Sequence, residues 1–147
     1  MTSILILNGA NLNMLGTRQP EIYGSATLDD IKSLCIAKAE EMGIGISFQQ
    51  SNSEGALIDE VHMAKNHQNG IIVNAGAYTH TSIALMDALI SVDLPVIELH
   101  LSNIHAREEF RHKSYIANAA IGIICGFGAY GYELAIDAMT RHLGIKR

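Results

Sequence analysis

The sequence predicts an α/β fold in which a parallel β-sheet is covered by helices on both faces. Five short, almost continuously apolar runs typical of buried strands recur along the chain, and stretches with helical spacing of apolar residues separate most of them. Strands that are apolar on both sides are typical of a parallel sheet with both faces covered. The 147 residues have the length of one ordinary domain, so we expect a single domain over residues 1–147.

The first half of the chain is expected to supply two strands and two helices. An apolar run over residues 3–7 closes on Asn8 and Gly9, which is a strand followed by a turn signal. A helix is expected after Thr27, which is well placed as its N-cap. A second strand is expected over residues 44–50, with a second helix behind it. Apolar residues at helical spacing mark the two helices: Leu28, Ile31, Leu34, Cys35 and Met42 in the first, and Leu57, Ile58, Val61 and Ala64 in the second.

The second half supplies three more strands, expected over residues 70–74, 95–100 and 119–125. A third helix ends before Pro95, and a closing helix is expected over residues 129–143. The third helix is marked by Ile83, Leu85, Met86, Leu89 and Ile90. Five strands in this pattern favour the flavodoxin-like order 2-1-3-4-5 in a three-layer sandwich. A ligand is then expected beyond the carboxyl ends of the strands, where the loops after the first and third strands diverge.

Composition and charge exclude several classes of partner. The net charge is −5 and the ten Lys and Arg residues are scattered, so we expect no nucleic acid partner. No run of 18 apolar residues occurs, and the first apolar run breaks at Asn8 without a basic segment before it, so we expect no membrane span and no signal peptide. Cys35 and Cys125 form no CxxC pair, which is typical of reduced core cysteines in a cytoplasmic protein. The low charged fraction of 17%, against about 25% in an average protein, agrees weakly with a surface covered by another subunit.

The loop after the first strand, residues 9–25, has a length typical of lids and binding loops. It runs GANLNMLGTRQPEIYGS and contains Asn11, Arg18 and Tyr23. In the predicted topology this loop leaves the same edge of the sheet at which a ligand is expected.

Polar residues also follow the third and fourth strands. Asn74 and His80 come after the third strand, in the segment NAGAYTHTS. Glu98 and His100 stand two residues apart at the end of the fourth strand, so strand alternation places both on one face of the sheet. These residues and the loop after the first strand share one end of one sheet, which favours a functional site there.

Each of these features also has a purely structural interpretation. Asn-Gly segments often only build turns, His80 could cap the third helix, and Glu98 with His100 could be a structural pair. Arg107 and Arg111, four residues apart, are expected on one side of a short helix, and helical Arg side chains are usually solvated. Their clustering at one end of the sheet weakens the structural interpretation.

Other kinds of site receive less support from the sequence. Residues 126–131, GFGAYG, match GxGxxG, but no further strand with an acidic residue follows, so these glycines are better explained by close packing of the last helix. Glu98 and His100 with His105 or His112 lack the spacing of known metal motifs, so we expect no metal. A flavin carrier would need a Ser/Thr-rich loop after the first strand, and a phospho-receiver would need clustered Asp at the strand ends. The chain instead has an Asn-rich loop, and Asn and His at those ends.

Five segments of the chain together resemble the type II 3-dehydroquinate dehydratase family. The matching segments are NGANLNMLGTRQPEIYG at 8–24, FQQSNSEGALID at 48–59, NAGAYTHTSIALMDAL at 74–89, ELHLSNIHAREEFRHKS at 98–114 and GFGAYGYELA at 126–135. The resemblance runs from end to end of the chain. One departure is visible: the family usually has Pro where Ala10 stands, which affects the stiffness of the loop but removes no polar group.

The resemblance implies an enzyme that converts 3-dehydroquinate to 3-dehydroshikimate by trans dehydration through an enolate, in the shikimate route to chorismate and the aromatic amino acids. It also implies a flavodoxin-like catalytic subunit without a cofactor, assembled as a homododecamer of four trimers. By resemblance, Tyr23 is the base that removes a C2 proton and Arg18 is its activating neighbour. Asn11 would order a water against the developing enolate, and His100, paired with Glu98, would protonate the leaving hydroxyl.

The resemblance also implies a set of residues that surround the substrate. Asn74, His80, Arg111 and the backbone of Leu101 and Ser102 would bind the substrate. Asp87 would reach the site of a neighbouring subunit, and Arg107 would support the lid.

Overall fold

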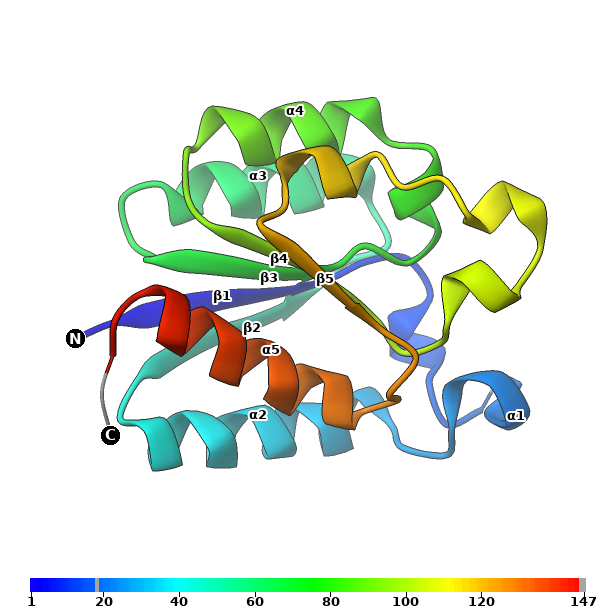
Figure 1. Ribbon diagram of the computed structural model, residues 1–147, viewed down its shortest axis with the longest axis horizontal. Coiled ribbons are helices and arrows are strands. Elements are labelled where there is room, and N and C mark those ends of the chain that lie inside the picture. Colours follow the sequence, from blue (N-terminus) through cyan, green and yellow to red (C-terminus); the bar gives the residue numbers. More distant parts are fainter. Residues whose placement is uncertain (18, 146–147) are drawn as a thin grey trace.

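The chain forms three layers, with one parallel sheet between two layers of helices (Figure 1). The computed structural model describes residues 1–17 and 19–145, and for Pro20 and Tyr23 it describes the backbone only. Helices α2 (Leu28–Met42) and α5 (Tyr130–His142) cover one face of the sheet, and helices α3 (Glu54–Ala64) and α4 (Ile83–Ser91) cover the other. A short helix, α1 (Pro20–Tyr23), lies in the loop that leads to α2.

The sheet has the strand order predicted from the sequence, β2-β1-β3-β4-β5, and all its pairings are parallel. The strands are β1 (Ser3–Asn8), β2 (Gly45–Gln50), β3 (Gly70–Asn74), β4 (Val96–His100) and β5 (Gly122–Cys125). The chain crosses from β1 outward to β2 and then back past β1 to β3, so the loops after β1 and β3 diverge at this point. Parallel α/β sheets place their ligands at such a switch point.

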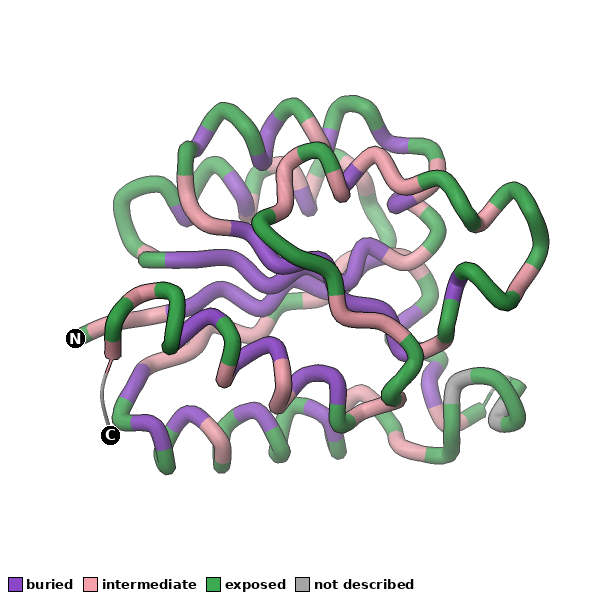
Figure 2. Tube along the Cα trace, viewed as in Figure 1, coloured by how far each residue is buried: buried purple, intermediate pink, exposed green. Residues whose placement is uncertain are grey.

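The apolar residues of the strands divide into two cores, one on each face of the sheet, as the burial in Figure 2 indicates. One core packs β1, β3 and β4 against α2 and α5, and it includes Ile4, Ile6 and Ile72. The other packs the alternate strand residues, such as Leu5 and Ile71, against α3 and α4. Strands with apolar side chains on both faces therefore have both faces buried, as expected for a parallel sheet.

A capping residue fixes the start of α2, and a glycine lets α5 pack closely on the sheet. Thr27 caps α2 as predicted, since its hydroxyl accepts the Asp30 backbone N–H while the Asp30 carboxylate accepts the Thr27 backbone N–H. Gly131, in the first turn of α5, lies so close to the sheet that a Cβ atom there would be 2.9 Å from Leu99 Cδ1. This confirms the prediction that a glycine in the GFGAYG segment permits close packing of the last helix.

Other predictions differ from the structure in detail. The fifth strand begins at Gly122 and not at residue 119, because Ile116–Ala119 forms a 3-10 turn. His80 does not cap α4: the cap is Ser82, and His80 ends the 3-10 turn Gly76–His80. The prediction that Arg107 and Arg111 lie on one side of a short helix is wrong. The chain makes two separate 3-10 turns there, Ile104–Ala106 and Glu109–Arg111, and Arg107 lies between them with an extended backbone.

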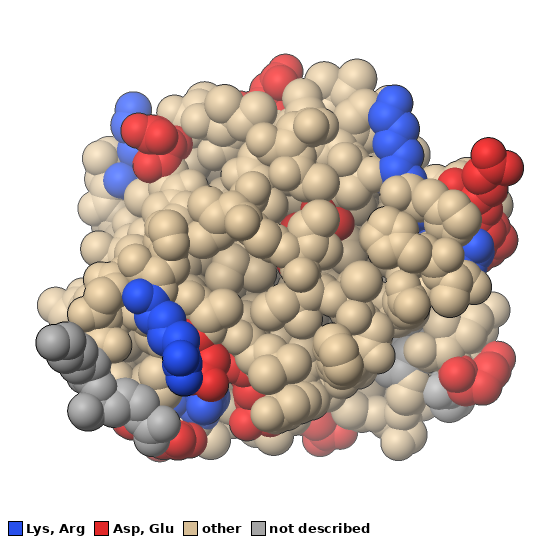
Figure 3. Space-filling model, in the orientation of Figure 1, with Lys and Arg blue, Asp and Glu red and all other residues tan. Residues whose placement is uncertain are grey.

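On the face of the molecule in Figure 3, basic side chains are spread among acidic and uncharged ones and form no patch. Among the described residues, no helix is long and apolar enough to cross a membrane.

Candidate active site

The backbones of the loops after β1 and β3 are in direct contact where they leave the sheet. Asn8 and Asn74 pair across the two strands, and the Gly9 backbone N–H donates to the Asn74 carbonyl at 2.7 Å. A Cβ atom at Gly9 would lie 2.2 Å from the Ala75 carbonyl oxygen, which is closer than two such atoms can approach. Only glycine fits at this position, so the glycine of the Asn-Gly turn signal brings the two loops together.

A pocket of about 170 Å³ opens directly beyond this contact. Its walls come from the loops after β1, β3 and β4, at the edge of the sheet where a ligand was expected. Most of the predicted site residues line it: Asn11, Asn74, His80, His100, Leu101, Ser102, Arg107 and Arg111. Residues up to a hundred positions apart in the sequence thus surround one small volume.

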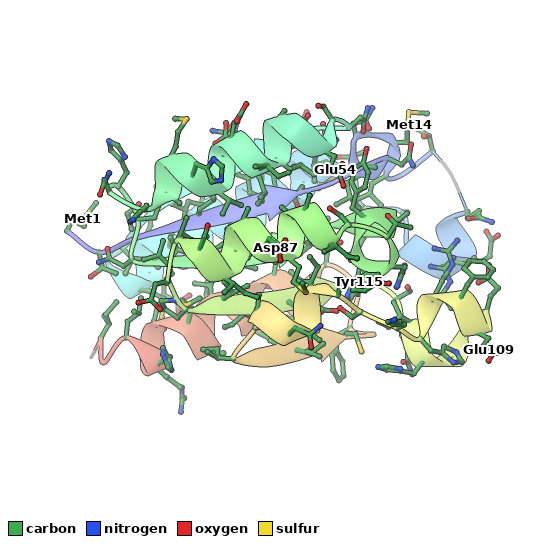
Figure 4. The ribbon with its side chains drawn as sticks, turned by 90° about the horizontal axis from the view of Figure 1, so that it is seen from above. Met1, Met14, Glu54, Asp87, Glu109 and Tyr115 are labelled. Atoms are coloured by element: carbon green, nitrogen blue, oxygen red, sulfur yellow. The ribbon has the colours of Figure 1, made fainter. Side chains whose placement is uncertain are left out.

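The remaining predicted residues lie elsewhere. Glu98 stands behind His100 and is fully buried. Asp87 is exposed on α4, away from the end of the molecule where Met14 and Glu109 are labelled (Figure 4). Arg18 and the side chain of Tyr23 lie outside the residues that the structure describes.

Glu98 and His100 form a buried pair. His100 Nε2 is 2.5 Å from Glu98 Oε2, and the two residues are 5% and 0% exposed. Strand alternation places both side chains on the same face of β4, as predicted. A carboxylate at this distance stabilises a positively charged imidazolium, and the second ring nitrogen, Nδ1, has no part in this contact.

The ring of His80 stacks on the ring of His100, with centroids 6.3 Å apart and planes 16° from parallel. His80 Nδ1 is 2.8 Å from the Lys113 carbonyl oxygen, which can only accept, so this nitrogen carries the hydrogen and donates it. Burial lowers the pKa of His80, with smaller contributions in the same direction from His100 and Arg111. The Lys113 hydrogen bond and Glu98 oppose this lowering of the pKa. A neutral His80 in this tautomer offers the lone pair of Nε2 to a hydroxyl group.

Asn74 belongs to a buried chain of hydrogen bonds that crosses the core. Its side-chain nitrogen donates to the Tyr132 hydroxyl at 3.0 Å, and that hydroxyl donates to Asn8 Oδ1 at 2.7 Å. The side-chain oxygen of Asn74 accepts the Gly76 backbone N–H at 3.3 Å. The amide of Asn74 is therefore fixed in one orientation at the pocket wall, since each of its two ends has a partner.

Two arginines line the pocket beside Ser102. Arg107 Nη1 donates to Ser102 Oγ at 3.3 Å, and Arg111 Nε donates to Glu108 Oε1 at 3.2 Å. The same Glu108 oxygen lies 3.6 Å from Arg107 Nε, so one carboxylate links both guanidinium groups, although only Arg111 belongs to a 3-10 turn and Arg107 lies in the extended segment before it. The pocket is thus positively charged on this side, which suits an anionic substrate.

Asn11 adopts the left-handed backbone conformation, with φ of 70°, which Asn tolerates better than most residues. Its backbone N–H donates to Asn52 Oδ1 at 2.9 Å, in the loop after β2. This contact fixes the start of the long loop against a neighbouring loop, with the Asn11 side chain at the pocket.

Two residues that support the site were not predicted from the sequence. Tyr132 orients Asn74, and Ser114 Oγ donates to Glu98 Oε1 at 2.7 Å. Both fall inside the segments quoted for the family resemblance, 126–135 and 98–114, but neither has a chemical pattern around it that predicts its contact. Among residues 1–17 and 19–145, no three His, Cys, Asp or Glu side chains converge as a metal site would require.

The fold and the site together define an α/β enzyme with a buried carboxylate–histidine pair at the carboxyl edge of its parallel sheet. The family model described as dehydroquinase class II matches residues 2–140. The chain therefore belongs to the class II dehydroquinase family, which confirms the resemblance seen in the sequence.

Individual relatives agree over nearly the whole chain. The 3-dehydroquinate dehydratase of Ruegeria pomeroyi is 63% identical over 143 residues, covering 97% of this chain and 96% of the relative. The 3-dehydroquinate dehydratase 2 of Pseudomonas aeruginosa is 53% identical over 135 residues, covering 92% and 91%. The crystal structure of the type II dehydroquinase from Butyrivibrio crossotus superposes with a TM-score of 0.93 at 42% identity, covering 95% of this chain and 97% of that one.

Proposed function

We propose that this chain, acting as a single catalytic domain, dehydrates 3-dehydroquinate by trans elimination through an enolate. The activity follows from the family: the chain is a hydro-lyase, a type II 3-dehydroquinate dehydratase of the shikimate pathway, and its substrate is 3-dehydroquinate. The observation that carries the mechanism is the Glu98–His100 pair, whose ring stands at the wall of a pocket lined by Asn74, His80 and Arg111.

The leaving hydroxyl of the substrate lies β to a ketone, so removal of a C2 proton gives an enolate that can expel it. The chemistry requires a base on one face, an acid on the other and a donor at the ketone oxygen. His100 is the acid in this proposal: it gives a proton to the leaving hydroxyl, which departs as water. Until that transfer, the Glu98 carboxylate stabilises the positively charged imidazolium of His100.

Tyr23 is the base in this proposal, with Arg18 as its activating neighbour. A phenol has a reference pKa of about 10, so a base that works near neutral pH needs its phenolate stabilised by roughly 4 kcal/mol. A nearby guanidinium can supply much of this where water is excluded. Arg18 precedes Tyr23 by five positions in one loop. Closure of that loop over the substrate would bring the two side chains together and exclude water at the same time.

The other polar groups bind and stabilise the substrate in this proposal. Asn11 orders a water that donates to the enolate oxygen, and Asn74 and His80 contact the substrate hydroxyls. The substrate carboxylate binds at the backbone N–H groups of Leu101 and Ser102, which line the pocket just before the turn Ile104–Ala106, and Arg111 assists there.

A direct assay tests the function. Addition of 3-dehydroquinate to the protein is expected to produce the absorbance of a conjugated enone. Treatment with borohydride in the presence of substrate should leave activity intact, because no lysine is among the described residues that line the pocket. Irreversible loss of activity would instead indicate a Schiff base and contradict the proposed non-covalent mechanism.

We also propose that the chain assembles as a homododecamer of four trimers. Asp87 is exposed on α4 and does not line the pocket of its own subunit, which agrees with a role at a neighbouring site. On the same helix, Ile83 and Ile90 are 50% and 52% exposed, which leaves apolar surface for a partner to cover. Gel filtration tests the assembly, and a mass near the 15.9 kDa of one chain would contradict it.

The proposed location is the cytoplasm. Cys35 is buried and free, and Cys125 is free and partly buried. Reduced cysteines of this kind are typical of cytoplasmic proteins. Localisation of a tagged chain by cell fractionation tests this proposal.

A further inference from the structure

We propose that Ser114 is a positioning residue of the active site, which acts on His100 through the carboxylate of Glu98. The proposal rests on the proposed acid role of His100. It adds a third member to the Glu98–His100 pair: a serine of the loop after β4 that had no predicted role.

Among the residues that the structure describes, each carboxylate oxygen of Glu98 has one hydrogen-bond partner. Oε2 contacts His100 Nε2 at 2.5 Å, and Oε1 accepts the Ser114 hydroxyl at 2.7 Å. Glu98 is 0% exposed. A buried carboxylate depends on its hydrogen-bond donors to remain charged, so the serine supplies one of the two protein contacts that stabilise the charge.

The direction of the serine hydrogen bond is fixed by a second contact. The backbone N–H of Ala117 donates to Ser114 Oγ at 3.0 Å, at the start of the 3-10 turn Ile116–Ala119. The serine oxygen therefore accepts from the backbone and directs its own hydrogen toward the carboxylate. The chain of donors runs from Ala117 through Ser114 to Glu98, and from there to the histidine ring.

The segment that contains Ser114 also fixes the second histidine of the site. The Lys113 carbonyl accepts from His80 Nδ1 at 2.8 Å, and the Tyr115 backbone N–H donates to the Thr79 carbonyl at 2.9 Å. Tyr115 is labelled in Figure 4, on the loop that returns from the turn at Glu109 toward the sheet. Three consecutive residues thus hold the loop after β3 and the carboxylate on β4, and so set the distance between the two stacked rings.

Loss of the hydroxyl should weaken the acid more than the binding of substrate. Without its serine donor the charged form of Glu98 is less stable, and an uncharged Glu98 no longer supports a charged His100. His80 stacks on His100, and Arg107 and Arg111 line the same pocket, so these are the other titratable or charged groups that face the ring. The Ser114 hydroxyl is hydrogen-bonded to the Glu98 carboxylate and to the Ala117 backbone N–H, so we expect its effect on the ring to pass through Glu98.

The first experiment compares Ser114→Ala with the wild-type enzyme. We expect kcat to fall about tenfold or more and KM to stay within about twofold of the wild-type value. We also expect a shift in the limb of the kcat–pH profile that reports the ionisation of the acid. Ser114→Thr keeps a hydroxyl and should restore most of kcat and the profile. Should Ser114→Ala fail to fold, Ser114→Cys replaces it, because a thiol keeps the packing but donates only weakly.

Ser3→Ala is the matched control. Ser3 Oγ is also partly buried and donates to a side-chain carbonyl oxygen, Gln68 Oε1, at 2.7 Å, but at the opposite edge of the sheet. We expect it to keep the wild-type kcat and pH profile. If Ser114→Ala behaves like Ser3→Ala, or loses kcat without a change in the pH profile, the proposal is wrong.

A double-mutant cycle tests the route through Glu98. In a Glu98→Gln background, adding Ser114→Ala should lower kcat by less than about twofold, because the charge that the serine stabilises is already gone. An equal fold-loss in both backgrounds would overturn the proposal. His100→Ala is measured beside them: full activity there contradicts the acid role itself, whereas an inactive His100→Ala with a normal Ser114→Ala contradicts only the role of Ser114.

Discussion

The hydroxyl of Tyr132 on α5 lies 3.0 Å from the side-chain nitrogen of Asn74 at the end of β3. Tyr132 is fully buried, and burial raises the pKa of its phenol, so the hydroxyl remains protonated and donates to Asn8. The orientation of the Asn74 amide at the pocket wall therefore depends on a residue of the last helix, 58 positions away in the sequence.

Replacement of Tyr132 by Phe should destabilise the protein and weaken substrate binding. Asn8 Oδ1 and Asn74 Nδ2 would lose their common partner inside the core, which costs about 1–3 kcal/mol. We expect a lower free energy of unfolding in urea and a higher KM. Tyr130→Phe is the control, since Tyr130 is 58% exposed on the same helix. Wild-type stability and KM in Tyr132→Phe would mean that the buried chain does not orient Asn74.

The acid assignment is tested by two substitutions of different strength. His100→Ala should lower kcat by about 10²–10⁴-fold, the usual contribution of a general acid, and Glu98→Gln should lower it less, because the ring remains but loses the charge beside it. His62→Ala, on the exposed surface of α3, serves as the control and should keep full activity. Steady-state kinetics with 3-dehydroquinate distinguishes these outcomes, and an active His100→Ala would assign the acid role to another residue.

The activation of the base by a cation gives a different kinetic signature. If Arg18 stabilises the phenolate of Tyr23, Arg18→Ala should reduce kcat by about 100-fold or more while KM changes little, since the interaction matters most as the proton is removed. Arg141→Ala, near the exposed end of α5, is a charge-matched control. Equal kcat values in Arg18→Ala and wild type would reject the role of Arg18.

His80 should stay neutral to lower pH than a free histidine. Burial lowers the pKa of His80, so its folded value lies below the unfolded value of about 6.5. Because the folded pKa is lowered, the stability that neutral His80 contributes is complete above pH 6.5. It is lost as the pH falls from 6.5 through the lower pKa of the folded state. Titration of the ring protons by NMR, assigned with a His80→Asn variant, should give a midpoint below 6.5. A midpoint above 6.5 would contradict the neutral, accepting role of Nε2.

Alkaline pH should destabilise the fold through Cys35. Burial, and to a smaller extent Glu133, raises the pKa of the Cys35 thiol from 9.0 to about 12. Because the folded value is raised, the contribution is complete below pH 9 and is lost above it, by up to about 1.4 kcal/mol per pH unit. Urea unfolding of wild type and Cys35→Ala at pH 8, 9 and 10 checks this. The variant should be less stable at pH 8 but show a flatter dependence, and parallel curves would rule out the thiol as the cause.

The regular parts of this fold were predictable because their signals are local. The apolar runs and the helix signals, such as the Thr27 cap, are visible within a few residues, and they yield all five strands and their order. The short turns between β4 and β5 have no such period, so the expected common helix for Arg107 and Arg111 was wrong. A single 3-10 turn has too few residues for apolar spacing to identify it.

The site was predictable to a similar degree, and for a related reason. Glu98 and His100 are two residues apart on a strand, so alternation alone brings them together. Ser114 reaches Glu98 across 16 positions, and Tyr132 reaches Asn74 across 58. Contacts of that kind depend on how the layers pack, and no pattern within a short window encodes them.

The contact between Gly9 and Ala75 limits how this enzyme can diverge. A side chain cannot be accommodated at that point, and Gly76, with φ of 60°, would bring a Cβ atom within 2.7 Å of the Ala10 carbonyl oxygen. The first residues of the loops after β1 and β3 therefore pack backbone against backbone, so insertions or rigid-body shifts cannot begin there. Sequence changes that alter substrate specificity, in evolution or in laboratory selection, must therefore fall in later residues of the loop after β1 or in the turns that follow His100.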